Sequence, residues 1–78
     1  MITSKNYSNV KMVLRHKPTD ILVHTGAQIK DFRGEPALIM SGNAPHKPSS
    51  SGKIYVEYSR TDKREVYPGV FNCEWVAQ

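Results

Sequence analysis

Apolar and polar residues alternate with a period of two in several short stretches of this chain. The clearest is "KIYVEYS" (53–59), where Ile54, Val56 and Tyr58 fall on one face and the residues between them fall on the other. Strict alternation is typical of a β-strand with one buried face, and β-branched and aromatic residues favour strands. We therefore expect a strand here, with Ile54 and Val56 in the core and Tyr55 outside.

The N-terminal part of the chain allows two interpretations. "VKMVLRH" (10–16) alternates, the turn-forming "KPTD" follows it, and "ILVH" (21–24) resumes extended character, which together predict a β-hairpin. Alternatively, Tyr7, Val10 and Leu14 have the spacing of a helix face, with Ser4 as the N-cap. We favour the hairpin because the stretch is short and contains β-branched residues, and a helix over 4–16 stays open. Residues 1–8 are expected to be loose.

Glycine and proline divide the middle of the chain. Residues 24–36 hold two glycines and a proline around isolated apolar residues, so we expect an irregular connection with a tight turn at Arg33–Gly34. "PALIMSG" (36–42) is a short apolar run between breakers, which predicts a buried strand. Residues 43–52 contain two prolines, three serines and a glycine, and are expected to form an exposed loop.

The C-terminal part predicts two further strands joined by a corner. After a turn at 60–63, residues 64–67 return antiparallel to 53–59 until Pro68, which has no N–H to donate to a neighbouring strand. Gly69 suits a type II turn at "YPGV". In "FNCEWV" (71–76), Phe71, Cys73 and Trp75 share the face that we expect to enter the core.

These elements predict a single all-β, mainly antiparallel domain over residues 1–78, built from about five short strands. Short strands separated by turns favour a small barrel or sandwich, because closure removes exposed strand edges. An open sheet with one helix is the alternative. A chain of this length buries only a small core, so we expect marginal stability.

Charge and composition narrow the classes of function. Eleven Lys and Arg against seven Asp and Glu give a net charge of +4, which favours nucleic acid or an acidic protein surface as a partner. No apolar run approaches the length of a membrane span, and the first ten residues lack the apolar stretch of a signal peptide. The one cysteine cannot form an internal disulfide. We therefore expect a cytoplasmic protein that does not associate with a membrane.

Residues with catalytic or metal-binding chemistry form no motif. Cys73 has no activating base near it in the sequence, and the histidines at 16, 24 and 46 lack the spacing of zinc ligands. "SSSGK" (49–53) lacks the first glycine and the final hydroxyl residue of a phosphate-binding loop. We predict a protein that is not an enzyme and that uses no metal or cofactor.

The most distinctive combination is aromatic and basic. Tyr55 shares its predicted outward face with Lys53, and more cations follow at the adjoining turn. An exposed ring beside cations can stack on a base while the cations contact phosphate. The same hairpin, with the "DFRGE" turn, is also the surface that we expect to contact a protein, and this interpretation is the favoured one. The candidate binding residues are Arg33, Lys53, Tyr55, Arg60, Lys63 and Arg64.

Two resemblances add to these expectations. "YPGVFNCEWV" resembles the end of an SH3-like barrel, in which a Pro-led 3₁₀ turn precedes a short closing strand; the resemblance implies such a turn at Pro68, Gly69, Val70 and Phe71. "PTDILVHTG … FRGEPALIMSG" is similar in rhythm to the strands of ribosomal and transcription-factor KOW modules, which also implies a small SH3-like barrel. The acidic first loop of signalling SH3 domains is absent, so proline-peptide binding is not implied. "HKPTD", "DFRGEPA", "SGKIYV" and "YPGVFNCEWV" resemble landmarks of small uncharacterised bacteriophage and bacterial proteins. This second resemblance implies a phage accessory protein and supplies no catalytic residue.

The sequence thus predicts a non-enzymatic binding module that acts through a host or phage protein. Nucleic-acid binding by the same small barrel is the alternative. The sequence does not set the oligomeric state, since an exposed strand edge can pair with a second copy.

Overall fold

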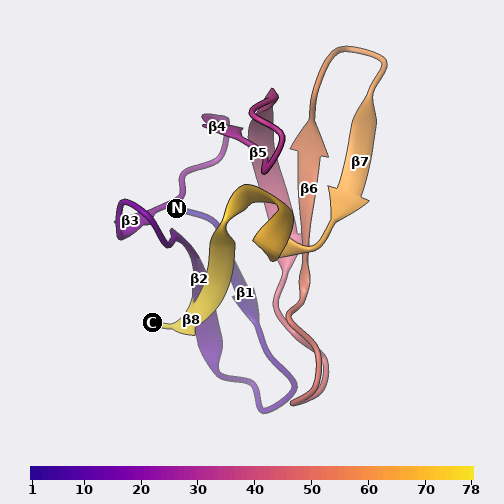
Figure 1. The fold of residues 1–78 in the computed structure, drawn as a ribbon. Coiled ribbons are helices and arrows are strands. Elements are labelled where there is room, and N and C mark those ends of the chain that lie inside the picture. Colours follow the sequence, from indigo (N-terminus) through magenta and orange to yellow (C-terminus); the bar gives the residue numbers. More distant parts are fainter.

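The chain forms two antiparallel β-sheets of four strands each (Figure 1). The computed structural model describes residues 1–78. Sheet A contains β1 (Thr3–Lys5), β2 (Lys11–His16), β3 (Ile21–Leu22) and β8 (Cys73–Ala77), and sheet B contains β4 (Ala27–Lys30), β5 (Pro36–Asn43), β6 (Lys53–Glu57) and β7 (Lys63–Val66). A 3₁₀ helix, η1 (Pro68–Phe71), joins β7 to β8. No helix has the length and apolar character needed to cross a membrane.

The all-β, mainly antiparallel class is confirmed, but the closed barrel is wrong. The two sheets stay separate, because β3 pairs only with β2 and β4 pairs only with β5. The strands also number eight rather than about five. The strands β1, β3 and β4 are short, and pairing with longer strands gives them their structure, which a local pattern does not reveal.

Strand β2 is the centre of sheet A because it pairs with β1, β3 and β8. The Leu14 N–H donates to the Ile2 carbonyl at 3.0 Å, and the Leu14 carbonyl accepts from the Val23 N–H at 2.9 Å. Both groups of one strand residue point to the same side, so β1 and β3 share one edge of β2 and β8 occupies the other. Residues 1–8, expected to be loose, therefore contain a paired strand and a buried Ile2. The helical alternative for residues 4–16 is also wrong.

Sheet B is a meander in which sequence neighbours are also spatial neighbours, in the order β4-β5-β6-β7. Ile54 and Val56 are fully buried and Tyr55 is exposed, which confirms the alternation expected for residues 53–59. The register between β5 and β6 shifts at Met40, so one extra residue interrupts the regular pairing. β5 then continues to Asn43, and residues 44–52 form the loop that returns to β6.

Residues 24–36, expected to be irregular, contain β4. Ala27 and Ile29 are half-buried while Gln28 and Lys30 are exposed, a period of two that extends over only four residues. Pairing with β5 gives this short stretch its strand structure. The tight turn expected after it is present, with Gly34 in the left-handed region at φ +84°.

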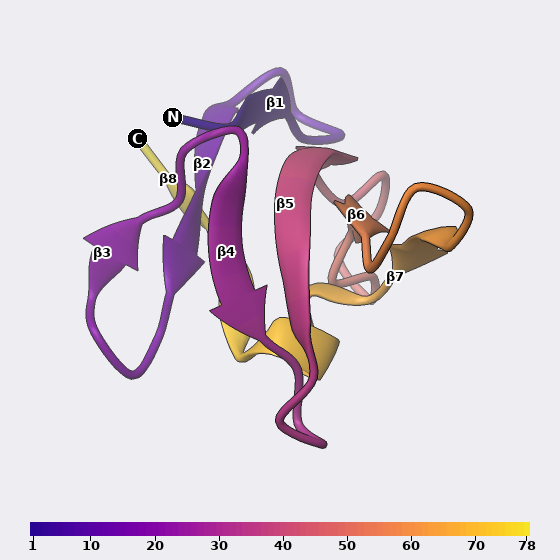
Figure 2. The same cartoon turned by 90° about the horizontal axis from the view of Figure 1, so that it is seen from above.

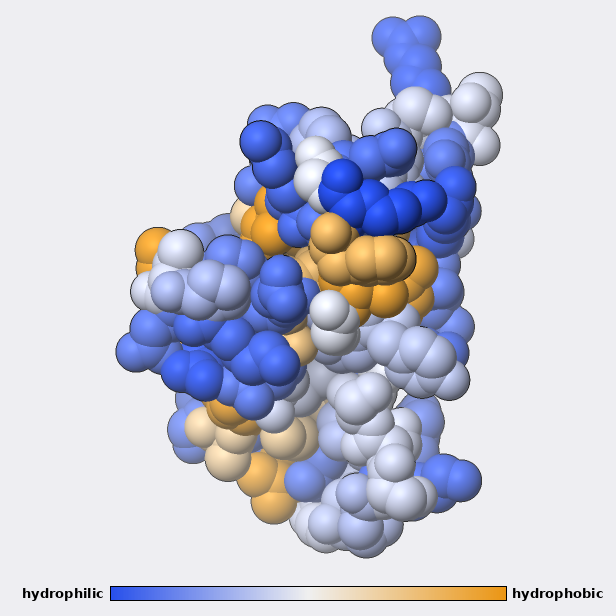
Figure 3. All heavy atoms as spheres, in the orientation of Figure 1, coloured by the Kyte–Doolittle hydropathy of each residue, from blue (hydrophilic) through white to orange (hydrophobic).

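The core takes side chains from both sheets and from η1. Phe71 and Cys73 are buried and Trp75 is 8% exposed, as the shared face of residues 71–76 predicts. The type II turn expected at "YPGV" is wrong, because Asn72, not Gly69, has the positive φ, at 56°, whereas the 3₁₀ turn that the SH3-like resemblance implies at Pro68–Phe71 is present. Polar residues cover most of the face in Figure 3, with apolar patches showing between them. The buried apolar cluster comprises Ile2, Leu14, Val23, Ala37, Ile39, Ala44, Ile54, Val56, Phe71, Cys73 and Trp75.

Candidate functional site

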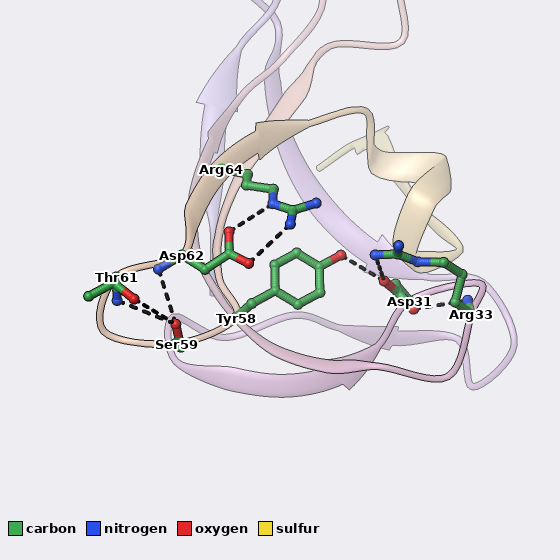
Figure 4. Close-up of polar contacts among 7 residues, drawn as sticks. All are labelled: Asp31, Arg33, Tyr58, Ser59, Thr61, Asp62 and Arg64. Carbon is green, nitrogen blue, oxygen red and sulfur yellow. Dashed lines mark hydrogen bonds and ion pairs between the residues drawn. The ribbon is translucent and has the colours of Figure 1, made fainter.

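A buried carboxylate joins the turn after β4 to the hairpin of β6 and β7 (Figure 4). Asp31 Oδ1 accepts hydrogen bonds from the backbone N–H groups of Arg33 and Glu35, both at 2.9 Å. Asp31 Oδ2 accepts from the Tyr58 hydroxyl at 2.7 Å and from the Arg33 guanidinium at 3.2 Å. One side chain therefore closes its own turn and binds a residue 27 positions later in the chain.

The charges of this cluster fix its protonation at neutral pH. Burial alone would raise the pKa of Asp31, but the hydrogen bonds from Tyr58, from the two backbone N–H groups and from Arg33 outweigh it and lower the pKa to about 2. Burial, and then the hydrogen bond to Asp31, raise the pKa of Tyr58. Asp31 is thus ionised and Tyr58 protonated across the physiological range, which suits a structural tie.

Three of the six predicted binding residues have an acidic partner. Besides the Arg33–Asp31 pair, Arg64 makes two hydrogen bonds to the Asp62 carboxylate, at 2.8 and 3.0 Å. The Lys63 ammonium lies 3.5 Å from a carboxylate oxygen of Glu57. The bond from Arg64 lowers the pKa of Asp62, so this acid stays ionised. Pairing of this kind reduces the positive charge that the hairpin offers to phosphate.

The six residues also do not form one patch. Arg64 lies opposite the buried Val56 in the β6–β7 register, so it is on the core side of sheet B, with its guanidinium 4.9 Å from the centre of the Tyr58 ring. Tyr55 points to the opposite face. Lys53 extends over the Tyr67 ring, with its ammonium 3.9 Å from the ring centre. Arg60 is exposed in the loop between β6 and β7.

Cysteine and histidine side chains provide no assembled catalytic or metal centre. Burial raises the pKa of the Cys73 thiol to about 11, so little thiolate exists at neutral pH. The thiol donates to the carbonyl of Phe71 instead, at 3.5 Å. His16 Nδ1 lies 2.8 Å from the Thr19 hydroxyl. No three His, Cys, Asp or Glu side chains of the chain are grouped as metal ligands would be.

The largest surface hollow is a groove of about 440 Å³ between β3 and β4, which are drawn on either side of β2 in Figure 2. Its apolar lining includes Ile21, which is 60% exposed, and the half-buried Ile29. No lining residue is acidic, and three carry imidazole or ammonium groups. The lining comprises His16, Thr19, Ile21, Leu22, Val23, His24, Ala27, Gln28, Ile29 and Lys30.

Both strands that border this groove have an unpaired edge. The Asp31 N–H donates to the Glu35 carbonyl at 2.8 Å, continuing the β4–β5 register. Bonded and non-bonded positions alternate in antiparallel pairs, so the backbone groups of Gln28 and Lys30 point away from β5. Unpaired N–H and C=O groups of this kind are the feature to which an extended peptide adds as a strand.

Comparisons with known proteins provide no relative. No family model, no curated protein and no solved structure matches this chain. The resemblance to small phage proteins therefore stays a prediction, and so does membership of an SH3-like family, although the two sheets do not close into a barrel.

Sequence reasoning missed the groove and the burial of Asp31. The groove could not be inferred, because β3 and β4 meet only through the packing of the two sheets. The sequence does contain a local signal for the turn at Asp31, because an aspartate side chain commonly accepts a hydrogen bond from the backbone N–H two residues later, here that of Arg33. Its burial depends on Tyr58, which is distant in the sequence.

Proposed function

We propose that this protein is a non-enzymatic module that binds an extended segment of a partner protein in the groove between β3 and β4. The observation that carries the proposal is an apolar hollow bordered by two unpaired strand edges. Backbone hydrogen bonds along such an edge supply affinity, and pockets for alternate side chains supply specificity. A cytoplasmic setting, expected from the sequence, is part of the proposal.

The chemistry of the lining selects the segment. Side chains of an added strand alternate between the two faces, so one set would enter the apolar hollow beside Ile21, Leu22 and Ile29. Lys30 is the one lining residue with an ammonium group and has no acidic neighbour in the groove, which favours acidic residues at the intervening positions, and His16 and His24 add polar groups for hydrogen bonds. The proposed ligand is an extended segment that alternates apolar and acidic side chains.

A host or phage protein is the partner class that the resemblance of the four landmark sequences supports. Nucleic-acid binding by the β6–β7 hairpin is the less favoured proposal, because Lys63 and Arg64 already contact carboxylates. The hairpin residues Lys53, Tyr55 and Arg60 stay candidates for either partner.

The direct test is an NMR titration of the whole chain with two matched eight-residue peptides, one alternating Val and Glu and the other Val and Lys. We expect backbone amide shifts at Ile21–Leu22 and Ala27–Lys30 with the Val–Glu peptide only. Two further Val–Glu peptides carry N-methyl groups on every second peptide nitrogen, one at the odd positions and the other at the even positions. Each keeps all the side chains but cannot donate backbone hydrogen bonds along one of its two strand edges. One of the two methylated peptides should therefore lose binding.

Charge reversal supplies the matched control. Lys30→Glu should weaken binding of the Val–Glu peptide and favour the Val–Lys peptide, whereas Lys47→Glu makes the same change of net charge at an exposed residue outside the groove lining and should alter neither. Shifts confined to the β6–β7 hairpin would contradict the proposal. Equal binding of both methylated peptides would contradict it as well.

A further inference from the structure

The acidic residues of this chain are absent from one end of the molecule. Residues 1–19 and 36–56 contain six Lys and Arg and no Asp or Glu. The fold brings parts of these two segments together, because the Tyr7 N–H donates to the Pro45 carbonyl at 3.1 Å and the Ala44 N–H donates to the Ser4 hydroxyl at 3.0 Å. The β1–β2 turn and the 44–52 loop accordingly lie side by side at the bottom of Figure 1. We name residues 5–11 and 44–52 the basic end.

Two lysines of the basic end face each other without an acid between them. Lys5 and Lys11 are direct partners in the β1–β2 register, and both are exposed. The neighbouring pair is bonded, since the Asn6 N–H donates to the Val10 carbonyl at 3.0 Å, so Lys5 and Lys11 occupy the non-bonded position, where side chains approach most closely. Like charges at opposite positions destabilise a strand pair.

Neither lysine of this pair has an Asp or Glu side chain as an ion-pair partner. Glu74, the acid on the neighbouring β8, lies opposite Arg15 and is hydrogen-bonded to it. Arg15 is four residues along β2 from Lys11, which is about 13 Å at the usual rise of a strand. Lys47, exposed in the 44–52 loop, adds a third cation with no ion-pair partner. An external anion is the group that would neutralise this end.

An ordered turn presents an aromatic ring among these cations. Asn6 Oδ1 accepts from the backbone N–H groups of Ser8 and Val10, both at 2.9 Å, and Asn9 takes a left-handed conformation at φ 61°. Tyr7 sits in this turn and is 53% exposed. The bond from its N–H to Pro45 holds the turn against the neighbouring loop, so the ring is offered from a fixed backbone.

We propose that the basic end binds single-stranded nucleic acid, with Lys5, Lys11 and Lys47 contacting phosphates and Tyr7 stacking on a base. Cations that follow the backbone and an exposed ring for the bases are the combination that such ligands require. This site is separate from the β3–β4 groove and does not rest on the peptide-binding proposal. A module with both sites would connect a protein segment to a nucleic acid.

The test measures fluorescence anisotropy of labelled twelve-nucleotide oligo-dT and oligo-U, with a duplex of equal length as comparison, at low and at physiological salt. Three phosphate contacts on a single strand predict a slope of log K against log salt of about −2. Lys5→Gln with Lys11→Gln should lower the affinity at about 50 mM salt by on the order of 10- to 100-fold and reduce that slope by about 1.4. Tyr7→Ala should lower single-strand affinity by about 5- to 100-fold and leave duplex affinity unchanged.

The matched control is Lys17→Gln, which removes one positive charge outside the basic end, as Lys11→Gln does within it, and should leave most of the affinity. An equal loss in this control would overturn the proposal, as would the absence of binding at low salt. Unchanged single-strand affinity in Tyr7→Ala would do so too. Stability gives an independent check: Lys5→Gln with Lys11→Gln should raise the melting temperature by about 1–6 °C as the repulsion is removed. A fall would overturn the argument from like charges.

Discussion

Replacing Gly52 with alanine tests a close backbone approach at the base of β6. Gly52 has φ +81°, and a Cβ there would lie 2.6 Å from the Asn43 carbonyl oxygen and 2.8 Å from Cδ1 of Trp75. The left-handed backbone costs an alanine about 1–2 kcal/mol. The overlap with backbone and indole adds about 1–3 kcal/mol, as overpacking does in protein cores. The sum of about 2–5 kcal/mol is large beside the roughly 4–12 kcal/mol expected for a domain of this size.

Gly26→Ala is the matched control, because Gly26 has φ +85° and no atom lies within 4 Å of the position that the added methyl group would take. It should show the backbone cost alone, about 1–2 kcal/mol. Urea unfolding followed by Trp75 fluorescence and by circular dichroism gives the free energy of unfolding of each variant. Loss of the fold in Gly52→Ala alone would agree with the larger cost. Equal values for the two variants, within about 0.5 kcal/mol, would refute the contact with Asn43 and Trp75.

Three further predictions concern the buried polar and aromatic groups. Tyr58→Phe should lower the free energy of unfolding by about 1–3 kcal/mol at neutral pH, since it removes a hydrogen bond to an ionised carboxylate. Because the pKa of Asp31 is lowered to about 2, the stabilisation that its ionised carboxylate gives the folded protein is complete above about pH 4 and is lost as the pH falls through about 2. The loss of unfolding free energy caused by Tyr58→Phe, measured by urea unfolding, should therefore shrink over that range. A loss that stays the same from about pH 4 to about pH 2 would contradict the role of the ionised carboxylate. Cys73, with its pKa raised to about 11 by burial, should resist Ellman's reagent in the native state and react once denatured, and rapid native labelling would contradict its burial. Trp75→Ala should cost about 3–5 kcal/mol, and a native emission spectrum like that of free tryptophan would speak against the packing that this value assumes.

The alternation of apolar and polar residues correctly predicted the buried side chains of the longer strands. The alternation of Ile54 and Val56, and of Phe71, Cys73 and Trp75, places these side chains in the core as expected. The strands that escaped prediction are defined by their partners. β1 is held in place by the backbone hydrogen bonds of Ile2 to Leu14 in β2 and to Val23, which follows β3. β4 is held in place by its pairing with β5.

The candidate surfaces show the same division. The sequence predicted the tight turn at Arg33–Gly34, but the burial of Asp31 beside it follows from Tyr58, which only the packing of sheet B brings near. It placed Tyr55 and Arg64 on one surface, but the register sets them on opposite faces of the sheet. The composition gives the net positive charge of the chain. The grouping of that charge around Lys5 and Lys11 depends on the fold, which brings together parts of the two segments without acidic residues, 1–19 and 36–56.

The pairing of β2 with β8 sets the order of events during synthesis. These strands pair residues 57 to 65 positions apart, so β2 leaves the ribosome well before its partner. At translation rates of about 5–20 residues per second, the interval is about 3–13 s, long compared with the formation of a hairpin. Throughout that time one edge of β2 is open and Leu14 lacks Trp75, its partner across that edge. During this interval the open edge of β2 in the nascent chain can pair with a strand of another chain, and this risk ends only when Cys73–Ala77 leaves the ribosome.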